Sequence, residues 1–226
     1  MAVMVSTIWP LAGLEVRTPS VTLRYVTDDL GFALAELAAQ GVHDRATMPF
    51  TRPWTDVAAP ELQRNTLRYY WRSRAETTVD HWDLHFAVLV SGVVVGMCSI
   101  ASDRFPVLRS AETGSWIGRA YQGRGIGREV RQAALHMIFR GLDADHATTG
   151  AWHDNVASLA VTRSLPYLQT GTSVQPRRGS PDRMLHFAIS RADWQRVARD
   201  DIELVGIDAV RAQLETRRNV RGASST

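Results

Sequence analysis

The chain of 226 residues is 45% hydrophobic, which is enough to bury the core of one domain. All 26 of its basic residues are arginine, they are scattered along the chain, and the net charge is only +3. This pattern does not predict a nucleic-acid-binding surface, which needs a basic stripe with interleaved aromatic residues. The absence of lysine favours a GC-rich coding bias and therefore a bacterial source.

No part of the sequence predicts secretion or a membrane partner. Residues 1–10 lack the basic start and the apolar core of a signal peptide. The longest apolar run, residues 86–100, is interrupted and too short to cross a bilayer. The single cysteine, Cys98, excludes a disulfide within the chain and is expected in the core. We therefore expect a cytoplasmic protein.

Hydrophobic periodicity and turn residues place the elements of the first half of the chain. Residues 1–19 are expected to form an irregular lead-in. The sequence then predicts strand 21–26, helix 28–40, loop 42–57, helix 60–76 and a hairpin of strands 83–90 and 93–100. The second helix carries an arginine run that is predicted to be mainly a solvated face, with an acidic substrate or RNA as the alternative: Arg64, Arg68, Arg72 and Arg74.

In the second half, a loop at 102–109 leads to a strand that ends near Gly118. A glycine-rich turn then opens a helix that ends at Gly141. The later predictions are strand 145–152, helix 155–164, strands 167–174 and 184–189 around a polar loop at 175–183, a helical turn at 193–199, a helix at 201–217 and disorder at 217–226. The predicted organisation is a lead-in at 1–19, one domain at 20–200, and a C-terminal helix and tail at 201–226.

The turn between the strand and the long helix has the composition of a phosphate-binding site. Gly123, Gly125 and Gly127 allow unusual dihedrals and a close approach of the backbone to a ligand. The first N–H groups of the helix lack internal partners and carry partial positive charge. Arg124 and Arg128 add charge suited to phosphate oxygens. The alternative is a turn that only packs the helix on the strand.

The spacing of this turn excludes two common phosphate-binding signatures. A Walker loop needs a lysine, and a dinucleotide fingerprint needs Gly-x-Gly-x-x-Gly, whereas the glycines here follow Gly-x-Gly-x-Gly. The run Gln122-x-x-Gly125-x-Gly127 after a strand instead resembles the pyrophosphate-binding signature of the GNAT N-acetyltransferase superfamily.

Further segments are similar to the branch of that superfamily that includes the ribosomal-protein N-terminal acetyltransferases. They are Asn155-x-x-Ser158 at the start of a short helix, and residues 48–51 and 111–117 upstream. The resemblance spans about residues 18–195, and it depends on the order and spacing of its parts more than on any one of them.

The resemblance implies an α/β (α+β) fold, with a GNAT-type mixed, twisted central sheet and helices on both faces. In that fold the strands ending at Gly118 and Trp152 splay apart, and the thioester arm of acetyl-CoA enters the gap. The implied reaction is direct attack of a primary amine on the thioester in a ternary complex. The amine belongs to a small molecule or to a protein N-terminus, and acyl groups longer than acetyl stay open.

The resemblance also assigns catalytic roles. Backbone N–H groups around Trp116 and Ile117 are expected to stabilise the charge that develops on the thioester carbonyl. Ser158 is expected to protonate the leaving thiolate, and Asn155 to hold the pantetheine arm. The alternatives are a helix N-cap for Asn155 and a capping or surface hydroxyl for Ser158.

The general base is predicted to be Glu112, acting from the central strand through water. A structural ion pair with an arginine is the alternative for Glu112, and His153 and His186 are alternate bases. Some relatives carry a glutamate in the last hairpin, where this chain has Gln-Pro-Arg-Arg at 175–178. This departure motivates an alternative function, a catalytically inactive GNAT-like CoA-binding sensor or partner-binding module.

These inferences define the expected ligand sites. The acetyl-CoA site comprises Trp116, Ile117, Gln122, Gly123, Arg124, Gly125, Ile126, Gly127, Arg128, Asn155 and Ser158. The acceptor site is expected to use three residues of loop 42–57 that could instead pack under it, namely Met48, Phe50 and Trp54. His81 and His85 lack a third ligand nearby, so no metal site is predicted. A monomer and a homodimer both remain open.

Overall fold

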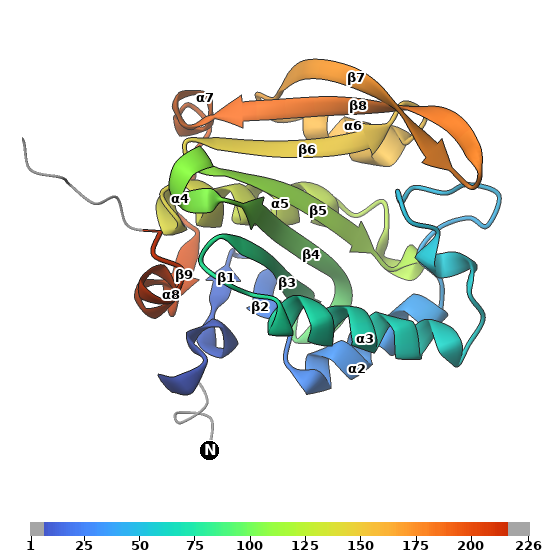
Figure 1. The fold of residues 1–226 in the computed structure, drawn as a ribbon, viewed down its shortest axis with the longest axis horizontal. Coiled ribbons are helices and arrows are strands. Elements are labelled where there is room, and N and C mark those ends of the chain that lie inside the picture. The colour runs from blue at the N-terminus through green and yellow to red at the C-terminus, as the bar shows by residue number, and fades with distance from the viewer. Residues whose placement is uncertain (1–6, 217–226) are drawn as a thin grey trace, which may run out of the picture.

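The computed structural model describes residues 7–216, so the tail expected to be disordered, 217–226, lies outside the described residues. A nine-stranded sheet has the order β7-β8-β6-β5-β4-β3-β2-β1-β9, and helices cover both of its faces (Figure 1). Its strands are β1 (Glu15–Arg17), β2 (Thr22–Tyr25), β3 (His81–Val90), β4 (Val93–Asp103), β5 (Ser110–Ile117), β6 (His146–Trp152), β7 (Leu168–Arg177), β8 (Ser180–Ser190) and β9 (Glu203–Val205).

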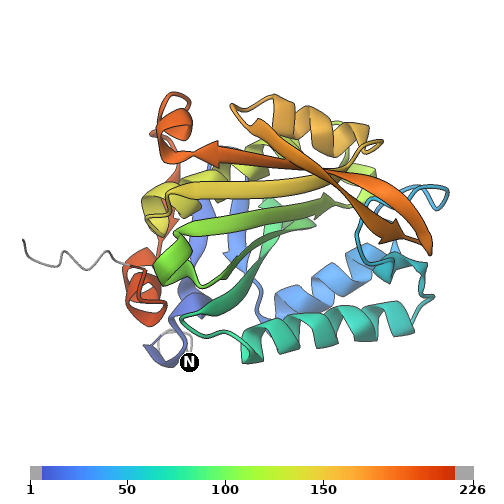
Figure 2. The same cartoon turned by 45° about the horizontal axis from the view of Figure 1, so that its top comes forward.

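The helices flank the sheet on both sides, which confirms the expected mixed, twisted sheet (Figure 2). The α-helices are α2 (Asp28–Ala39), α3 (Glu61–Ala75), α4 (Phe105–Leu108), α5 (Ile126–His136), α6 (Val156–Arg163), α7 (Arg191–Gln195) and α8 (Ile207–Gln213). Shorter turns are η1 (Pro10–Gly13), η2 (Trp54–Asp56), η3 (Arg119–Tyr121) and the π-helical η4 (Met137–Gly141), which extends α5. None of the described helices combines the length and apolar character needed to cross a bilayer.

The two larger of the three hydrophobic clusters among the described residues hold the layers together, one on each face of the sheet. The larger core packs α5 and η4 against the sheet through fully buried side chains such as Phe86, Ile100 and Phe139. The smaller core packs α2 and α3 on the opposite face around Leu34 and Tyr70. Burying each such side chain stabilises the fold by about 1.5–3 kcal/mol relative to leaving it exposed. The helices are therefore fixed relative to the strands that they flank.

Several segments differ from the sequence-based expectation. The lead-in contains η1 and β1, and the tail contains β9 and α8 rather than one continuous helix. β1 pairs with both β2 and β9, so the two ends of the chain extend the same sheet. The loop at 102–109 contains α4. The polar loop at 175–183 is the end of the β7–β8 hairpin, which turns at Arg178-Gly179 with φ values of 48° and 82°.

The sheet opens between β5 and β6, its one parallel pair within residues 7–216. The two strands are in register only from Ser110 opposite His146 to Glu112 opposite Thr148. At the next residues the backbone hydrogen bonds between the two strands end. A side-chain hydrogen bond follows, in which the Thr149 hydroxyl donates to the Thr113 carbonyl at 3.0 Å. Beyond this point β5 and β6 continue without pairing, which confirms the predicted splay.

Candidate active site

A cleft of about 720 Å³ opens on the gap between β5 and β6. Its walls come from the 49–54 segment, α3, β3, β4, β5, β6, the start of α6, one residue of α5 and one residue of β8. Of the predicted site residues, the fold brings six together along this cleft: Phe50, Trp54, Glu112, Trp116, Asn155 and Ser158. Residues far apart in the sequence therefore meet here, at the place where the sheet is open.

The edge of β5 that faces the gap carries main-chain donors. The Gly118 N–H donates to the Val95 carbonyl of β4 at 2.9 Å. Because successive residues of an antiparallel strand direct their N–H groups to opposite sides, the Trp116 N–H also faces β4. The N–H groups of Ser115 and Ile117 then face the gap. Of the two residues predicted to supply donors, Ile117 thus directs its N–H group to the gap, whereas the N–H group of Trp116 faces β4 and that of Ser115 faces the gap.

The glycine-rich turn lies outside the cleft, at the N-terminus of α5. Gly123 and Gly125 have φ values of 76° and 78°, which an L side chain rarely adopts. Within the described chain, the main-chain N–H groups of residues 123–127 donate to no protein atom. The exposed Arg124 and Arg128 flank these donors. Unpartnered amides at a helix N-terminus beside two guanidinium groups fit the diphosphate of a CoA thioester.

The turn is tied to the strand and to the cleft by its neighbours. The Gln122 side-chain amide donates to the Val42 and Ile117 carbonyls, each at 2.7 Å. This side chain therefore holds the turn against the end of β5. A Cβ on Gly127 would lie 3.5 Å from Val161 of α6, so α5 and α6 approach closely at this glycine. Gly127 thus connects the turn to the helix whose first residues line the cleft.

Asn155 and Ser158 lie at the start of α6. The Asn155 Oδ1 atom accepts a hydrogen bond from the Ser158 main-chain N–H at 3.1 Å, which is the N-cap arrangement. The cap uses only the oxygen, so the two amide N–H groups of Asn155 remain available to a ligand. Both residues are partly exposed and line the cleft. The capping alternative is therefore realised for Asn155, and it leaves a ligand contact open.

Glu112 lies on β5 with its carboxylate exposed in the cleft. No arginine of the described chain forms an ion pair with it, so the structural alternative for this residue has no counterpart in the fold. The two alternate bases lie elsewhere: His153 pairs with Asp182 at 3.1 Å, and His186 contacts the Ser173 hydroxyl at 2.7 Å.

A polar cluster that the sequence did not indicate lies on the same wall. The Tyr69 hydroxyl donates to Asp83 at 2.9 Å, and His85 lies 3.0 Å from that hydroxyl and 3.3 Å from the carboxylate. Burial opposes ionisation of Asp83, but hydrogen bonds from His85 and Tyr69 outweigh it and hold the pKa of Asp83 below its ordinary value. Its second carboxylate oxygen is buried without a partner in the described structure.

Asp83 and Glu112 form a row of carboxylates across the sheet. Asp83 is in register with Ala101, and Ala101 is in register with Glu112. The two acidic residues are thus separated by one strand on the same face, which corresponds to about 10 Å between their Cα atoms. A cationic amine can lie between them, on the α3 side of the gap.

The 42–57 segment covers this side of the cleft. Phe50 packs on Trp54 with ring centroids 5.1 Å apart, and Trp54 contacts Trp116 of β5 at 6.0 Å. Met48, predicted with them, is only 2% exposed and does not line the cleft, because it packs under the segment. Two of the three predicted acceptor residues therefore face the cleft.

The tip of the β7–β8 hairpin lies beside this segment (Figure 1). Arg177 donates to the Met48 carbonyl at 2.8 Å, and Arg178 makes a bidentate contact with Asp56 at 2.7 and 2.9 Å. Arg177 also pairs with Asp154 and Asp182. The hairpin therefore presents no carboxylate to the cleft, and its arginines fasten the covering segment instead.

The arginine run of α3 is divided between two environments. Arg64 and Arg68 pair with Glu61, and Arg74 pairs with Asp28. Arg68 and Arg72 also line the cleft, together with Arg52 of the covering segment. The prediction of a solvated face is thus incomplete, because part of the run borders the site.

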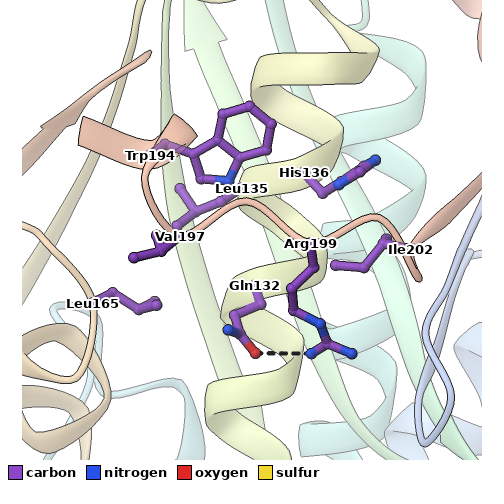
Figure 3. Close-up of a pocket in the computed structure, with 8 residues that line it drawn as sticks. All are labelled: Gln132, Leu135, His136, Leu165, Trp194, Val197, Arg199 and Ile202. Carbon is purple, nitrogen blue, oxygen red and sulfur yellow. Dashed lines mark hydrogen bonds between the residues drawn. The ribbon is translucent and has the colours of Figure 1, made fainter. Parts of the chain in front are cut away.

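A second hollow lies on the far side of α5, among side chains that include Gln132, Trp194 and Arg199 (Figure 3). Its volume is about 10 Å³, which has room for about one water molecule. Arg199 donates to the Gln132 amide oxygen at 3.0 Å across it. This hollow is a packing defect and offers no space to a substrate.

Comparison with known proteins identifies the family to which this fold belongs. A family model described as the acetyltransferase (GNAT) domain matches residues 20–166. The fold is similar to the ribosomal L7/L12 alpha-N-protein acetyltransferase RimL in complex with coenzyme A, with a TM-score of 0.61 and 19% identity over 76% of this chain and 95% of that one.

Two further structures have the same fold. One is the ribosomal-protein-S5-alanine acetyltransferase from Vibrio fischeri, with a TM-score of 0.62 and 16% identity over 80% of this chain and 98% of that one. The other is yncA from Salmonella typhimurium with its cofactor acetyl-CoA, with a TM-score of 0.56 and 19% identity over 76% and 94%. With the family model covering more than half of its residues, the chain belongs to the GNAT acetyltransferase family.

Proposed function

We propose that the protein is an N-acetyltransferase that moves the acetyl group of acetyl-CoA to a primary amine by direct attack in a ternary complex. Family membership supplies the reaction class and acetyl-CoA as the acyl donor. The observation that carries the rest is the open gap between β5 and β6. Main-chain donors of β5 face it from one side, and a carboxylate of the same strand stands at its α3 face.

Binding of the donor is assigned to three groups of this chain. The N–H groups of residues 123–127, with Arg124 and Arg128, hold the diphosphate. The amide of Asn155 contacts the pantetheine arm. The N–H groups of Ser115 and Ile117 are aimed where negative charge develops on the thioester oxygen, and such donors contribute about 2.7–4 kcal/mol each to catalysis.

Proton transfer is assigned to Glu112 and Ser158. An alkyl or N-terminal amine is mostly protonated at neutral pH and attacks only after it loses a proton. Glu112 accepts that proton through water, and Asp83 on the same row holds the ammonium group before the transfer. Ser158, which also lines the cleft, donates to the thiolate as it leaves.

The acceptor is inferred to carry negative charge close to its amine. Arg52, Arg68 and Arg72 line the same cleft as the carboxylates of Asp83 and Glu112. An ammonium group enters between the carboxylates while its acidic neighbours contact the guanidinium groups. Two of the similar structures are named for acetylation of ribosomal proteins, and an acidic protein N-terminus fits this arrangement here as well as an acidic small amine does.

The donor site is tested by titrating acetyl-CoA into wild-type protein and Gly125→Glu. The new side chain strains a left-handed backbone position and opposes the diphosphate, so binding is expected to be lost. Gly92→Glu is the matched control, because Gly92 has a φ of 79° in the β3–β4 turn and equal open space. Unchanged affinity of Gly125→Glu would reject the placement of the donor at this turn.

The hairpin favours one alternative function. Because Arg177 and Arg178 leave no hairpin carboxylate in the cleft, an inactive CoA-binding sensor or partner-binding module is the second candidate. Incubation with acetyl-CoA and a panel of amines, read by mass spectrometry, separates the two. Tight binding of CoA without any acetylated product would favour the module, and an acetylated amine would exclude it.

A further inference from the structure

A buried arginine on α5 has no role in the chemistry assigned so far. Arg131 is only 5% exposed, and it lines the cleft. Its Nη1 atom is buried without a hydrogen-bond partner, and no carboxylate of the described chain forms an ion pair with it. A buried guanidinium stays charged, and leaving it unpaired costs several kcal/mol. A buried, unpaired guanidinium that lines a cleft is suited to bind an anionic group of a ligand.

The side chains around Arg131 orient it without neutralising it. The ring of Tyr167 lies 5.7 Å from the guanidinium carbon, at the distance of a cation–π contact. Cys98 lies close enough for an electrostatic interaction, but burial raises the pKa of its thiol to about 12. The thiol is therefore neutral at physiological pH and supplies no counter-charge.

The location of Arg131 indicates which part of a ligand it meets. The residue follows Ile126, the first residue of α5, by five positions, which places it about 7.5 Å further along the helix axis than the N-terminus of α5. The same cleft is lined by Thr113 and Thr149, whose side chains donate across the gap between β5 and β6. The guanidinium therefore lines the cleft that opens on this gap, into which the proposed function places the acyl end of the thioester.

We propose that the cleft also accepts thioesters of dicarboxylic acids, in which the acyl chain ends in a carboxylate that pairs with Arg131. The inference rests on the proposed function, because it assumes that the acyl end of a CoA thioester enters the gap. The amine forms its C–N bond at the thioester carbonyl, the C–S bond breaks, and Glu112 takes the amine proton. The distal carboxylate is unchanged and serves only for recognition through a bidentate contact.

The experiment compares coenzyme A, acetyl-CoA and succinyl-CoA by isothermal titration with wild-type protein and Arg131→Met. Charge-assisted hydrogen bonds predict that the wild type binds succinyl-CoA about tenfold or more tighter than acetyl-CoA. Arg131→Met should abolish this preference and leave the affinities for coenzyme A and acetyl-CoA within about twofold. Methionine fills a similar volume, and replacing a buried charge by an apolar side chain is commonly tolerated.

Arg124→Met is the matched control, since it should weaken all three ligands alike by removing a diphosphate contact. Equal affinity of the wild type for acetyl-CoA and succinyl-CoA would overturn the inference, even if Arg131→Met failed to fold. A loss of coenzyme A affinity in Arg131→Met would also overturn it, because the guanidinium would then contact the pantetheine arm. Failure of all three ligands to bind wild-type protein would instead refute the proposed function.

Discussion

At the scale of single residues, Glu112 is proposed to accept the amine proton and Asp83 to hold the ammonium group. Glu112→Gln keeps the shape of the side chain and removes its ability to accept a proton. We expect kcat to fall by about 10²–10³-fold, with acetyl-CoA affinity unchanged in a titration. Glu36→Gln on the exposed face of α2 is the control. If Asp83→Asn lowers kcat and Glu112→Gln does not, the base is Asp83.

Arg199 provides a residue-scale prediction about stability and pH. It pairs with Glu129 at 2.7 Å and with Asp201 at 2.8 Å. Burial raises the pKa of Glu129, but hydrogen bonding to Arg199 outweighs it, so the folded-state pKa lies below the ordinary value. A carboxyl with a depressed pKa stabilises the fold above its ordinary pKa of about 4.3, and this contribution is lost as the pH falls through the folded value.

Arg199→Met should therefore lower the Tm by about 2–4 °C at pH 7. The difference from wild type should shrink as the pH falls from about 6 to about 3. Thermal unfolding across this pH range is the measurement, with Arg163→Met on exposed α6 as the control. A difference that stays constant with pH would show that the ion pairs do not carry the effect.

At the scale of elements, the site depends on two segments that hold each other across the mouth of the cleft. Arg178 fastens the 42–57 segment through Asp56 and the Arg45 carbonyl. Arg178→Ala should release the segment and raise the KM for the amine several-fold, while acetyl-CoA affinity stays unchanged. Arg183→Ala, exposed on the same hairpin, is the matched control. A change in donor affinity instead would mean that the hairpin acts on the CoA site.

Most helices and strands were predictable from the sequence, because hydrophobic periodicity marks an element and glycine residues mark the turns between elements. The Ser91-Gly92 turn and the strand–turn–helix around Gly125 were placed from sequence for this reason. The ends of β7 and β8 were not, since polar residues on a mostly exposed hairpin carry no alternating hydrophobic pattern. The Tyr69–Asp83 contact joins α3 to β3, and only the packed fold reveals it.

Arg131 was missed for a different reason, although a signal was present. Val130 and Ala134 fall at helical spacing on the apolar face of the long helix, and Arg131 lies at the edge of this face and is buried as well. An arginine beside an apolar helix face indicates either that the helix phase is assigned wrongly or that the arginine is buried and has a function. Sequence periodicity alone does not distinguish the two explanations, because it contains no information on the cleft that Arg131 lines.

At the scale of the whole molecule, the two ends of the chain close one edge of the sheet. β1 lies between β2 and β9, and β1 and β9 are only three residues long, too short for a hydrophobic pattern to predict. We propose that the acetyltransferase domain, drawn at 20–200 from sequence, unfolds together with the segments on either side of it. Leu14 and Leu214, one from each segment, belong to the same large core.

Leu214→Ala tests whether the domain and its flanking segments unfold together. The side chain is 1% exposed, and truncating such a leucine costs about 2–5 kcal/mol. We expect one cooperative thermal transition with a Tm lowered by several degrees, together with loss of acetyl-CoA binding at the same temperature. Val197→Ala, at a position that is 40% exposed, should have little effect. Two separate transitions would show that the C-terminal segment is an independent unit.

The crossed threonines at the end of the β5–β6 ladder have a consequence for substrate length. Since the Thr113 and Thr149 side chains donate across the gap to main-chain carbonyls, the wedge between the strands has a floor at a fixed depth. A longer acyl chain would extend past this floor only if β5 and β6 separated further, which would break the backbone hydrogen bonds between them. We therefore expect the depth of this wedge to limit the length of the acyl group that the protein accepts.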